Sequence, residues 1–198
     1  TNLSYTVNYY WNGTEIPVKP SKTVLHQTFG AEATESPIGA DDYTPESNEP
    51  KKIKIGADST QNVINFYYYR NVKLTANSDA VTYDGNDRSV FGFTGAPKEA
   101  DFSAIQVSAM GKNFGTYPAA FAEGTVGTVD KTKKYIVTDA TNGQLTINKR
   151  NVVLTSETAS KTYDGTALTR PNVAVGGDGF VDGEVSDVKA TGSVTNAS

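Results

Sequence analysis

One stretch of this 198-residue chain occurs twice, at a spacing of 80 residues. Residues 70–85 and 150–165 align without a gap, and 9 of 16 positions are identical. Each copy opens with Arg-Asn-Val and closes with Thr-Tyr-Asp-Gly. Self-similarity at a fixed period is the signature of a repeat architecture. We therefore expect one repeat over 70–150 and a partial second repeat over 151–198, whose remainder would follow Ser198.

The composition favours strands joined by turns and excludes several kinds of chemistry. Thr, Val and Tyr are abundant, as are the turn residues Gly and Asn. The chain has no Cys, which rules out disulfides, thiol catalysis and Cys-type zinc sites. The net charge of −4 argues against a nucleic-acid partner. No apolar run approaches the ~18 residues that a membrane span needs, and we expect a monomer.

Residues 1–69 read as a small aromatic module. Alternating apolar residues over 4–11 predict a half-buried strand, and Asn12-Gly13 is a strong hairpin signal. Residues 15–28 supply the return strand, and residues 51–55 alternate again. Residues 62–69 carry apolar side chains on both faces, as a central strand does. With a helical turn near 31–35, this pattern suggests a β-grasp-like sheet.

The same region resembles the mucin-binding-protein (MucBP) repeat of Gram-positive surface proteins. The resemblance implies a ubiquitin-like β-grasp fold and a location on the bacterial cell surface. Asp42 departs from the family pattern, which usually has Gly there. The segments that carry the resemblance are Tyr5-Thr6-Val7-Asn8-Tyr9, Ser21-Lys22-Thr23-Val24, Gly30, Tyr43 and Asn62-Val63-Ile64-Asn65-Phe66-Tyr67-Tyr68.

Residues 70–150 show short strand patterns and no long helical period, which predicts an all-β unit. Residues 134–138 and 144–148 look like a hairpin with Thr141-Asn142-Gly143 at its tip. In the second copy, residues 172–175 and 185–194 are the strand candidates. Together with the N-terminal module, the repeats predict a mainly β chain whose modules follow one another in an elongated arrangement without flexible linkers.

The repeat is similar to the YDG/MBG repeats of bacterial adhesins. The similarity rests on Thr82-Tyr83-Asp84-Gly85, its copy Thr162-Tyr163-Asp164-Gly165, Gly115-Thr116-Tyr117 and Gly143-Gln144-Leu145-Thr146-Ile147. These residues indicate turns and core. Gly supplies the positive φ of the turn, and Asp bonds the backbone that follows it. We expect Tyr83 and Tyr163 to occupy equivalent, largely buried positions.

An excess of aromatic residues in 1–69 is the most suggestive functional feature. Sugars stack on aromatic rings, so an exposed row of rings would bind glycans. The competing interpretation is that rings on paired strands only stabilise the sheet, and the clear alternation favours this second reading. The candidate glycan-binding residues are Tyr10, Trp11 and Tyr69.

No other constellation predicts catalysis or a cofactor. His26 is the only histidine, and nothing near it resembles a nucleophile elbow. Asp41 and Asp42 are adjacent, so they read as an acidic loop rather than as a glycosidase pair. Asp178, Asp182 and Glu184 lack EF-hand spacing and are better explained by turns than by calcium. We expect neither an enzyme, a metal nor a cofactor.

Two classes of function fit these features. One is a cell-wall-anchored adhesin that binds mucin or other host glycoprotein glycans weakly and multivalently. The other is a stalk that projects a distant binding domain and binds nothing itself. Both imply an extracellular protein on the bacterial surface.

Overall fold

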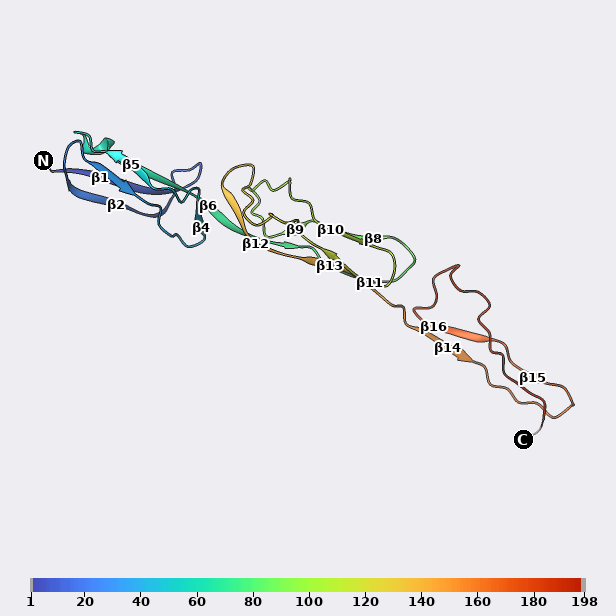
Figure 1. Cartoon of the computed structure of the whole chain (residues 1–198). Helices are drawn as coiled ribbons and strands as arrows, with labels where there is room; N and C mark the ends of the chain where they lie inside the picture. Colours follow the sequence, from blue (N-terminus) through green and yellow to red (C-terminus); the bar gives the residue numbers. More distant parts are fainter. Residues whose placement is uncertain (1, 197–198) are drawn as a thin grey trace. The chain divides into compact units, whose positions relative to one another are not determined.

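The computed structural model describes residues 2–196, and their regular structure is β apart from one 3-10 turn, η1 (Ser59–Gln61) (Figure 1). The mainly β class is confirmed. None of the described residues forms a helix long and apolar enough to cross a membrane. The strands are β1 Leu3–Trp11, β2 Pro17–Gln27, β3 Glu32–Glu35, β4 Tyr43–Pro45, β5 Lys51–Lys54, β6 Val63–Ala76, β7 Asp79–Thr82, β8 Arg88–Phe91, β9 Phe93–Thr94, β10 Ser108–Gly111, β11 Gly115–Ala119, β12 Tyr135–Thr141, β13 Gly143–Asn148, β14 Val152–Ser156, β15 Leu168–Thr169, β16 Val173–Gly177 and β17 Ser193–Val194.

The chain forms two compact units, each of which combines segments distant in sequence. Unit 1 consists of residues 1–77, 91–108 and 119–143. Unit 2 consists of residues 78–90, 109–118 and 144–198.

Unit 1 begins with a sheet in which β1 lies between β2 and β6. β1 and β2 are antiparallel across the Asn12-Gly13 turn, as the sequence predicts, and β1 and β6 are parallel. Every second side chain of these strands points into the core, because successive residues of a strand face opposite sides of the sheet. The buried members on β1 and β6 are Tyr5, Val7, Tyr9, Ile64, Phe66 and Tyr68.

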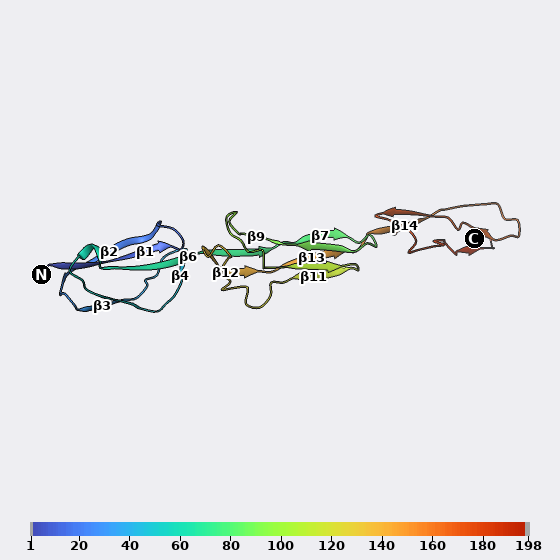
Figure 2. The same cartoon turned by 90° about the horizontal axis from the view of Figure 1, so that it is seen from above.

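The segment predicted to form a helical turn near 31–35 is a strand instead, so that prediction is wrong. β3 pairs antiparallel with β5, and Ala33 lies opposite Ile53. This pair covers one face of the β1–β2–β6 sheet, and β3 is visible beneath it in Figure 2. Ala33 and Ile55 are buried against the tyrosines and phenylalanine of the sheet, and this burial outweighs the weak helical preference of the segment.

β6 passes from the N-terminal module into the first repeat without a break. Tyr68 O accepts a hydrogen bond from Asn12 N at 2.8 Å, and Arg70 N donates to Lys134 O at 2.8 Å. Backbone groups two residues apart face the same edge of a strand. β1 and β12 therefore follow one another along one edge of β6, while Asn71 N bonds Asp42 O at 2.8 Å on the other edge.

The predicted hairpin of residues 134–138 and 144–148 is wrong. β12 pairs in parallel with β6, whereas β13 pairs in parallel with β7 and also joins β11. Gly143 begins β13, at the point where the chain leaves the sheet of β12 and enters the sheet of β7 and β11. A Cβ atom there would stand 2.3 Å from Asn77 O, so the close backbone approach requires glycine. Leu145 and Ile147 of β13 are buried in unit 2.

The second copy forms two small strand pairs in unit 2, β14 with β16 and β15 with β17. Of the predicted strand at 185–194, only Ser193 and Val194 are in strand conformation. The pairing of β14 with β16 repeats the pairing of β6 with β9. Thr75 lies opposite Thr94 in the first copy, and Thr155 lies opposite Ala174 in the second, so both positions shift by 80 residues.

Candidate functional site

The outer face of the N-terminal sheet carries a group of tyrosines that we name the tyrosine face: Tyr10, Tyr67 and Tyr69. These residues alternate with the core residues of β1 and β6 and are half-buried. Tyr10 lies beside Tyr67 in the parallel register, with ring centroids 6.4 Å apart and planes tilted by 36°. The two rings thus form a continuous aromatic surface.

Polar side chains flank these rings on the same face. Asn8 Nδ2 donates to Asn65 Oδ1 at 3.0 Å, and Ser21 Oγ donates to Asn8 Oδ1 at 2.7 Å. At the edge of β6, Lys51 Nζ lies 5.5 Å from the centroids of both the Tyr67 ring and the core Phe66 ring, within cation–π distance. Aromatic surface next to amide and hydroxyl groups is suited to a ligand with both apolar C–H faces and hydroxyl groups.

Tyr69 stands at the end of this face. Its hydroxyl donates to Glu46 Oε1 at 3.4 Å. Partial burial, followed by the nearby Glu46 carboxylate, raises the pKa of the Tyr69 hydroxyl.

Trp11 does not share this face, because it continues the core side of β1. Its indole Nε1 donates to Lys134 O at 2.8 Å, and its ring packs edge-on against Tyr135 with centroids 5.6 Å apart. Lys134 Nζ lies 5.7 Å from the indole centroid. The structure thus brings Tyr10 near Tyr67 and places Trp11 where β1 meets β12. The parallel register, which pairs Tyr10 with Tyr67, cannot be read from the sequence.

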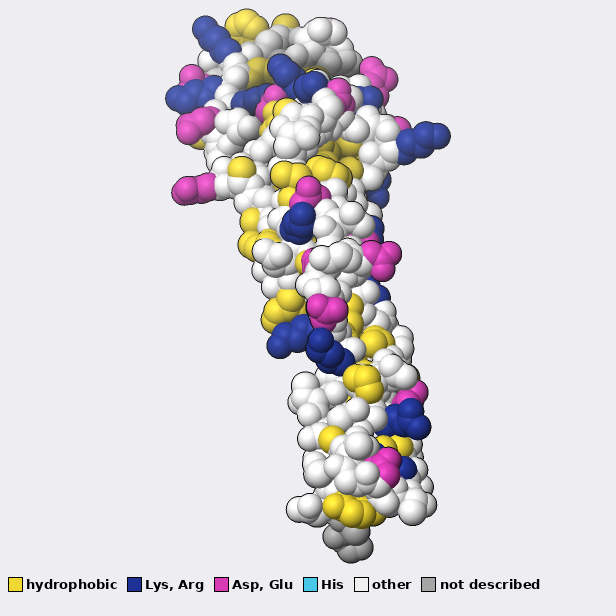
Figure 3. Space-filling view, turned by 90° about the vertical axis from the view of Figure 1, so that its right-hand side faces the viewer, with side chains coloured by type: hydrophobic (Ala, Val, Ile, Leu, Met, Phe, Trp, Pro, Cys, Tyr) yellow, Lys and Arg dark blue, Asp and Glu magenta, His cyan; other side chains and the backbone are white. Residues whose placement is uncertain are grey.

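Apolar and charged side chains are mixed on the face of the molecule seen in Figure 3. On this face, Lys and Arg side chains alternate with Asp and Glu side chains, and apolar groups are small and separate. No broad basic or apolar area stands out in this view.

The two Tyr-Asp-Gly segments form the same local turn. Asp84 Oδ1 accepts from Asn86 N at 3.1 Å, and Asp164 Oδ1 accepts from Thr166 N at 2.9 Å. Gly85 and Gly165 have φ of 79° and 77°. Hydrogen bonds from Lys161 and then Thr166 lower the pKa of Asp164 to about 2. The side-chain and backbone bonds of Asn86 likewise lower the pKa of Asp84.

The expectation that both tyrosines are largely buried is wrong, most clearly for Tyr163, which is 64% exposed. Tyr83 is half-buried, and its hydroxyl donates to a Glu184 carboxylate oxygen. The local turn is the same in both copies, so the difference in exposure comes from the segments that pack against each tyrosine. Residues 181–184 lie against Tyr83, whereas residues 194–196 lie beside Tyr163 and leave it exposed.

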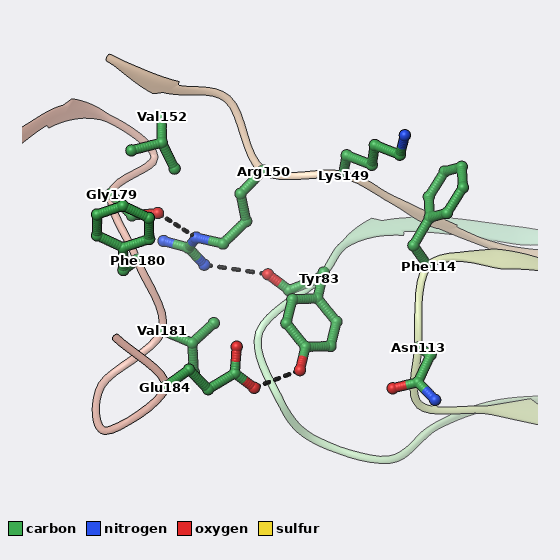
Figure 4. Close-up of a pocket in the computed structure, with 10 residues that line it drawn as sticks. All are labelled: Tyr83, Asn113, Phe114, Lys149, Arg150, Val152, Gly179, Phe180, Val181 and Glu184. Carbon is green, nitrogen blue, oxygen red and sulfur yellow. Dashed lines mark hydrogen bonds between the residues drawn. The ribbon is translucent and has the colours of Figure 1, made fainter. Parts of the chain in front are cut away.

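Tyr83 lines a pocket of about 310 Å³ in unit 2 (Figure 4). Apolar side chains make up most of its wall, and Lys149 Nζ lies 4.7 Å from the Phe114 ring centroid. The pocket lies where the end of the first repeat meets the second. The lining residues are Tyr83, Asn113, Phe114, Lys149, Arg150, Val152, Gly179, Phe180, Val181 and Glu184.

Arg150 joins the segments around this pocket. Its guanidinium donates to Tyr83 O at 3.0 Å, to Gly179 O at 2.7 Å and to Asp178 O. Asn151 N donates to Asp178 Oδ2 at 2.7 Å. Because these donors are held by backbone carbonyls, Arg150 fixes the loop and has less capacity for a ligand.

The acidic residues that were considered as calcium ligands also accept hydrogen bonds from other parts of the chain. Asp178 accepts from Asn151, and Glu184 accepts from Tyr83. Within residues 2–196, no three His, Cys, Asp or Glu side chains gather as a metal site would require. His26 and Asp42 are exposed and have φ of 60° and 61°. Neither forms part of a nucleophile–base pair among the described hydrogen bonds.

Comparisons with protein-family models, curated proteins and solved structures found no match to this chain.

Proposed function

We propose that this chain belongs to a modular adhesin of the Gram-positive cell surface that binds mucin or other host glycans through the tyrosine face. The observation that carries the proposal is the adjacent Tyr10 and Tyr67 rings beside the Asn8–Asn65 amide pair. Ring faces stack on the C–H side of a sugar, and amides bond its hydroxyl groups. Four other aromatic residues of β1 and β6 are buried in the core and serve stability instead: Tyr5, Tyr9, Phe66 and Tyr68.

Such a shallow face would bind one glycan weakly. A dissociation constant of ~1 mM corresponds to about −4 kcal/mol. Tandem modules on one cell would raise the effective concentration and convert this weak affinity into avidity. Binding should therefore be faint for the free chain and strong for a dense display.

The test is retention of mucin by beads that carry the intact 198-residue chain at high density. We expect Tyr10→Ala and Tyr67→Ala to reduce retention while circular dichroism remains unchanged, since both side chains lie outside the core. Tyr163→Ala is the control, because Tyr163 is an exposed tyrosine that lies in unit 2, away from the tyrosine face. Equal retention by all variants, or no retention above blank beads, would reject the glycan face.

A stalk that binds nothing itself is the second candidate, and the course of β6 favours it. The strand crosses from residue 69 to 70 without a linker, and the Trp11–Tyr135 contact braces the same place. Such joints would hold successive modules in an elongated arrangement. In this proposal the N-terminal module has a β-grasp fold. Small-angle scattering that shows a compact, rounded particle would count against the stalk and leave the glycan proposal intact.

A further inference from the structure

Unit 1 pairs its strands in parallel at two successive places along β6. β1 is the first strand, and β6 carries the chain out of the N-terminal module; the two run parallel, with residues 6–11 opposite residues 63–68. β6 then pairs in parallel with β12, the last strand of unit 1. Parallel neighbours cannot be joined by a tight turn. Two long segments therefore link the paired strands, and we name them the first connection (residues 12–62) and the second connection (residues 77–134).

This pairing determines how tension along the chain acts on the strands. Tension pulls the start of β1 and the end of β6 in opposite directions, so the two strands must slide past each other. The hydrogen bonds between strands lie across the direction of sliding, so sliding breaks the bonds of a pair together. Separation of the strands from one end would break the same bonds one after another. Sliding is thus the direction in which the pair resists most.

Hydrogen bonds hold the β1–β6 pair at both ends. Thr6 N donates to Asn62 O at 2.9 Å, and Asn12 N donates to Tyr68 O at 2.8 Å. Sliding would have to break both of these bonds and the ladder between them.

Side chains on both faces of the β1–β6 pair oppose the same movement. On the core face, Tyr9 stacks on Phe66 with ring centroids 6.1 Å apart, and it meets Tyr68 edge-on at 6.4 Å. On the outer face, Asn8 Nδ2 donates to Asn65 Oδ1 at 3.0 Å. A shift by one residue would also turn every side chain of the strand to the other face. These contacts must therefore break before β1 can move along β6.

The two parallel pairs follow one another along β6. Trp11 lies opposite Tyr68 at the end of the first pair, and Tyr135 lies opposite Arg70 at the start of the second. Tension can thus pass from β1 to β6 and from β6 to β12 through hydrogen bonds between strands. Neither connection lies on this path.

We propose that unit 1 transmits tension along the chain, with the β1–β6 and β6–β12 pairs as two mechanical clamps in series. The clamps keep both connections from being stretched until a clamp breaks. A cell-surface protein experiences such tension whether its modules bind a ligand or only project one. The inference does not rest on glycan binding by the tyrosine face, so the force test and the mucin test can fail separately.

The test pulls single molecules of the 198-residue chain between two introduced cysteines, which define the points of force because the chain has no Cys of its own. Asn2→Cys with Lys73→Cys makes β1 and β6 slide. Asn2→Cys with Gln61→Cys separates the same strands, since both positions lie just before the two strands begin. At one loading rate, we expect a several-fold higher unfolding force for sliding than for separation.

The second clamp is tested in the same way. Gln61→Cys with Thr141→Cys pulls the start of β6 away from the end of β12. Thr75→Cys with Thr141→Cys separates the two strands instead, because these positions lie opposite each other. We again expect the higher unfolding force for sliding.

Urea unfolding of the same variants is the control. Every substituted residue is exposed, so all variants should have nearly equal free energies of unfolding. Forced unfolding depends on the rate of unfolding rather than on this free energy. A difference in force therefore reports the direction of pulling.

Two results would overturn the proposal. One is an unfolding force for sliding that does not exceed the force for separation. The other is gradual lengthening of the molecule before the unfolding step, which would show that the connections and not the strand pairs bear the tension.

Discussion

The guanidinium of Arg150 donates a hydrogen bond to the backbone oxygen of Tyr83 at 3.0 Å, although the two residues lie 67 positions apart. The same side chain holds the backbone oxygens of Gly179 and Asp178. Arg150 opens the second copy of the repeat, and its bonds anchor the turn that closes the matching motif of the first copy. The most recurrent residues of the sequence thus meet at the point where one copy follows the other.

Arg150→Ala should destabilise unit 2. It removes three charge-assisted hydrogen bonds, and each is worth about 1.5–3 kcal/mol when not replaced by water. Because Arg150 is half-buried, we expect a net loss of about 2–3 kcal/mol. Urea unfolding followed by circular dichroism measures it. The control is Arg70→Ala at the matching position of the first copy, which is exposed and should change stability by less than ~0.5 kcal/mol.

Trp11→Ala should destabilise unit 1 rather than only weaken glycan binding. The change removes the indole contact with Tyr135 and the bond to Lys134 O. Loss of a large packed aromatic costs about 3–5 kcal/mol when fully buried, so we expect about 3 kcal/mol for this half-buried ring. Thermal unfolding checks the loss, with Tyr10→Ala as the control on the outer face. Equal stability of the two variants would contradict the packing role of Trp11.

Asp130 should hold the loop before β12 in a pH-dependent way. It is 3% exposed, and its carboxylate accepts bonds from the backbone N–H groups of Asp101, Thr132, Lys134 and Tyr135. Burial alone would raise the pKa of this carboxyl, but these bonds and the Thr132 hydroxyl outweigh it and lower the pKa.

A lowered pKa means that the ionised form stabilises the fold. This contribution is complete above the unfolded pKa of about 3.9 and is lost as the pH falls through the lower folded value. Asp130→Ala should cost about 3 kcal/mol at pH 7, since buried N–H groups lose their acceptor. Unfolding curves at several pH values test this. The exposed Asp139→Ala should follow the unmodified chain throughout.

Tyr5 should resist ionisation more than an ordinary tyrosine. Its hydroxyl donates to Glu35 Oε1 at 2.7 Å. This bond, followed by burial and the charge of Glu35, raises the pKa of Tyr5 to about 12. The protonated phenol therefore stabilises the fold below the unfolded pKa of about 10, and this stability is lost as the pH rises through the folded value.

Residue-resolved NMR of the tyrosine rings measures this pKa directly. Glu35→Gln should lower the pKa of Tyr5 towards its ordinary range, because it removes the charged acceptor. Glu32→Gln is the control, since Glu32 pairs with Lys52 on the surface instead. A Tyr5 pKa that does not respond to Glu35→Gln would show that the hydrogen bond is not its cause.

The sequence by itself determined the class of fold and the position of most strands. Alternating residues placed β1, β5 and β6, because a strand shows opposite faces to core and solvent. Asn12-Gly13 set the first turn, since few residue pairs adopt its backbone geometry. The repeat at a spacing of 80 predicted equivalent local turns at Asp84 and Asp164, and in both turns the aspartate accepts a hydrogen bond from the backbone N–H two residues on.

Only the tertiary structure decided which strands pair and which side chains are covered. The sequence placed β12 and β13 next to each other, yet β12 joins β6 and β13 joins β7, because pairing depends on distant edges and apolar faces. The segment at 32–35 became a strand because β5 offers it a partner. Identical motifs left Tyr83 half-buried and Tyr163 exposed, since burial depends on the segment that packs over a residue. Local sequence determines the geometry of a turn, whereas the burial of a side chain depends on segments from elsewhere in the chain.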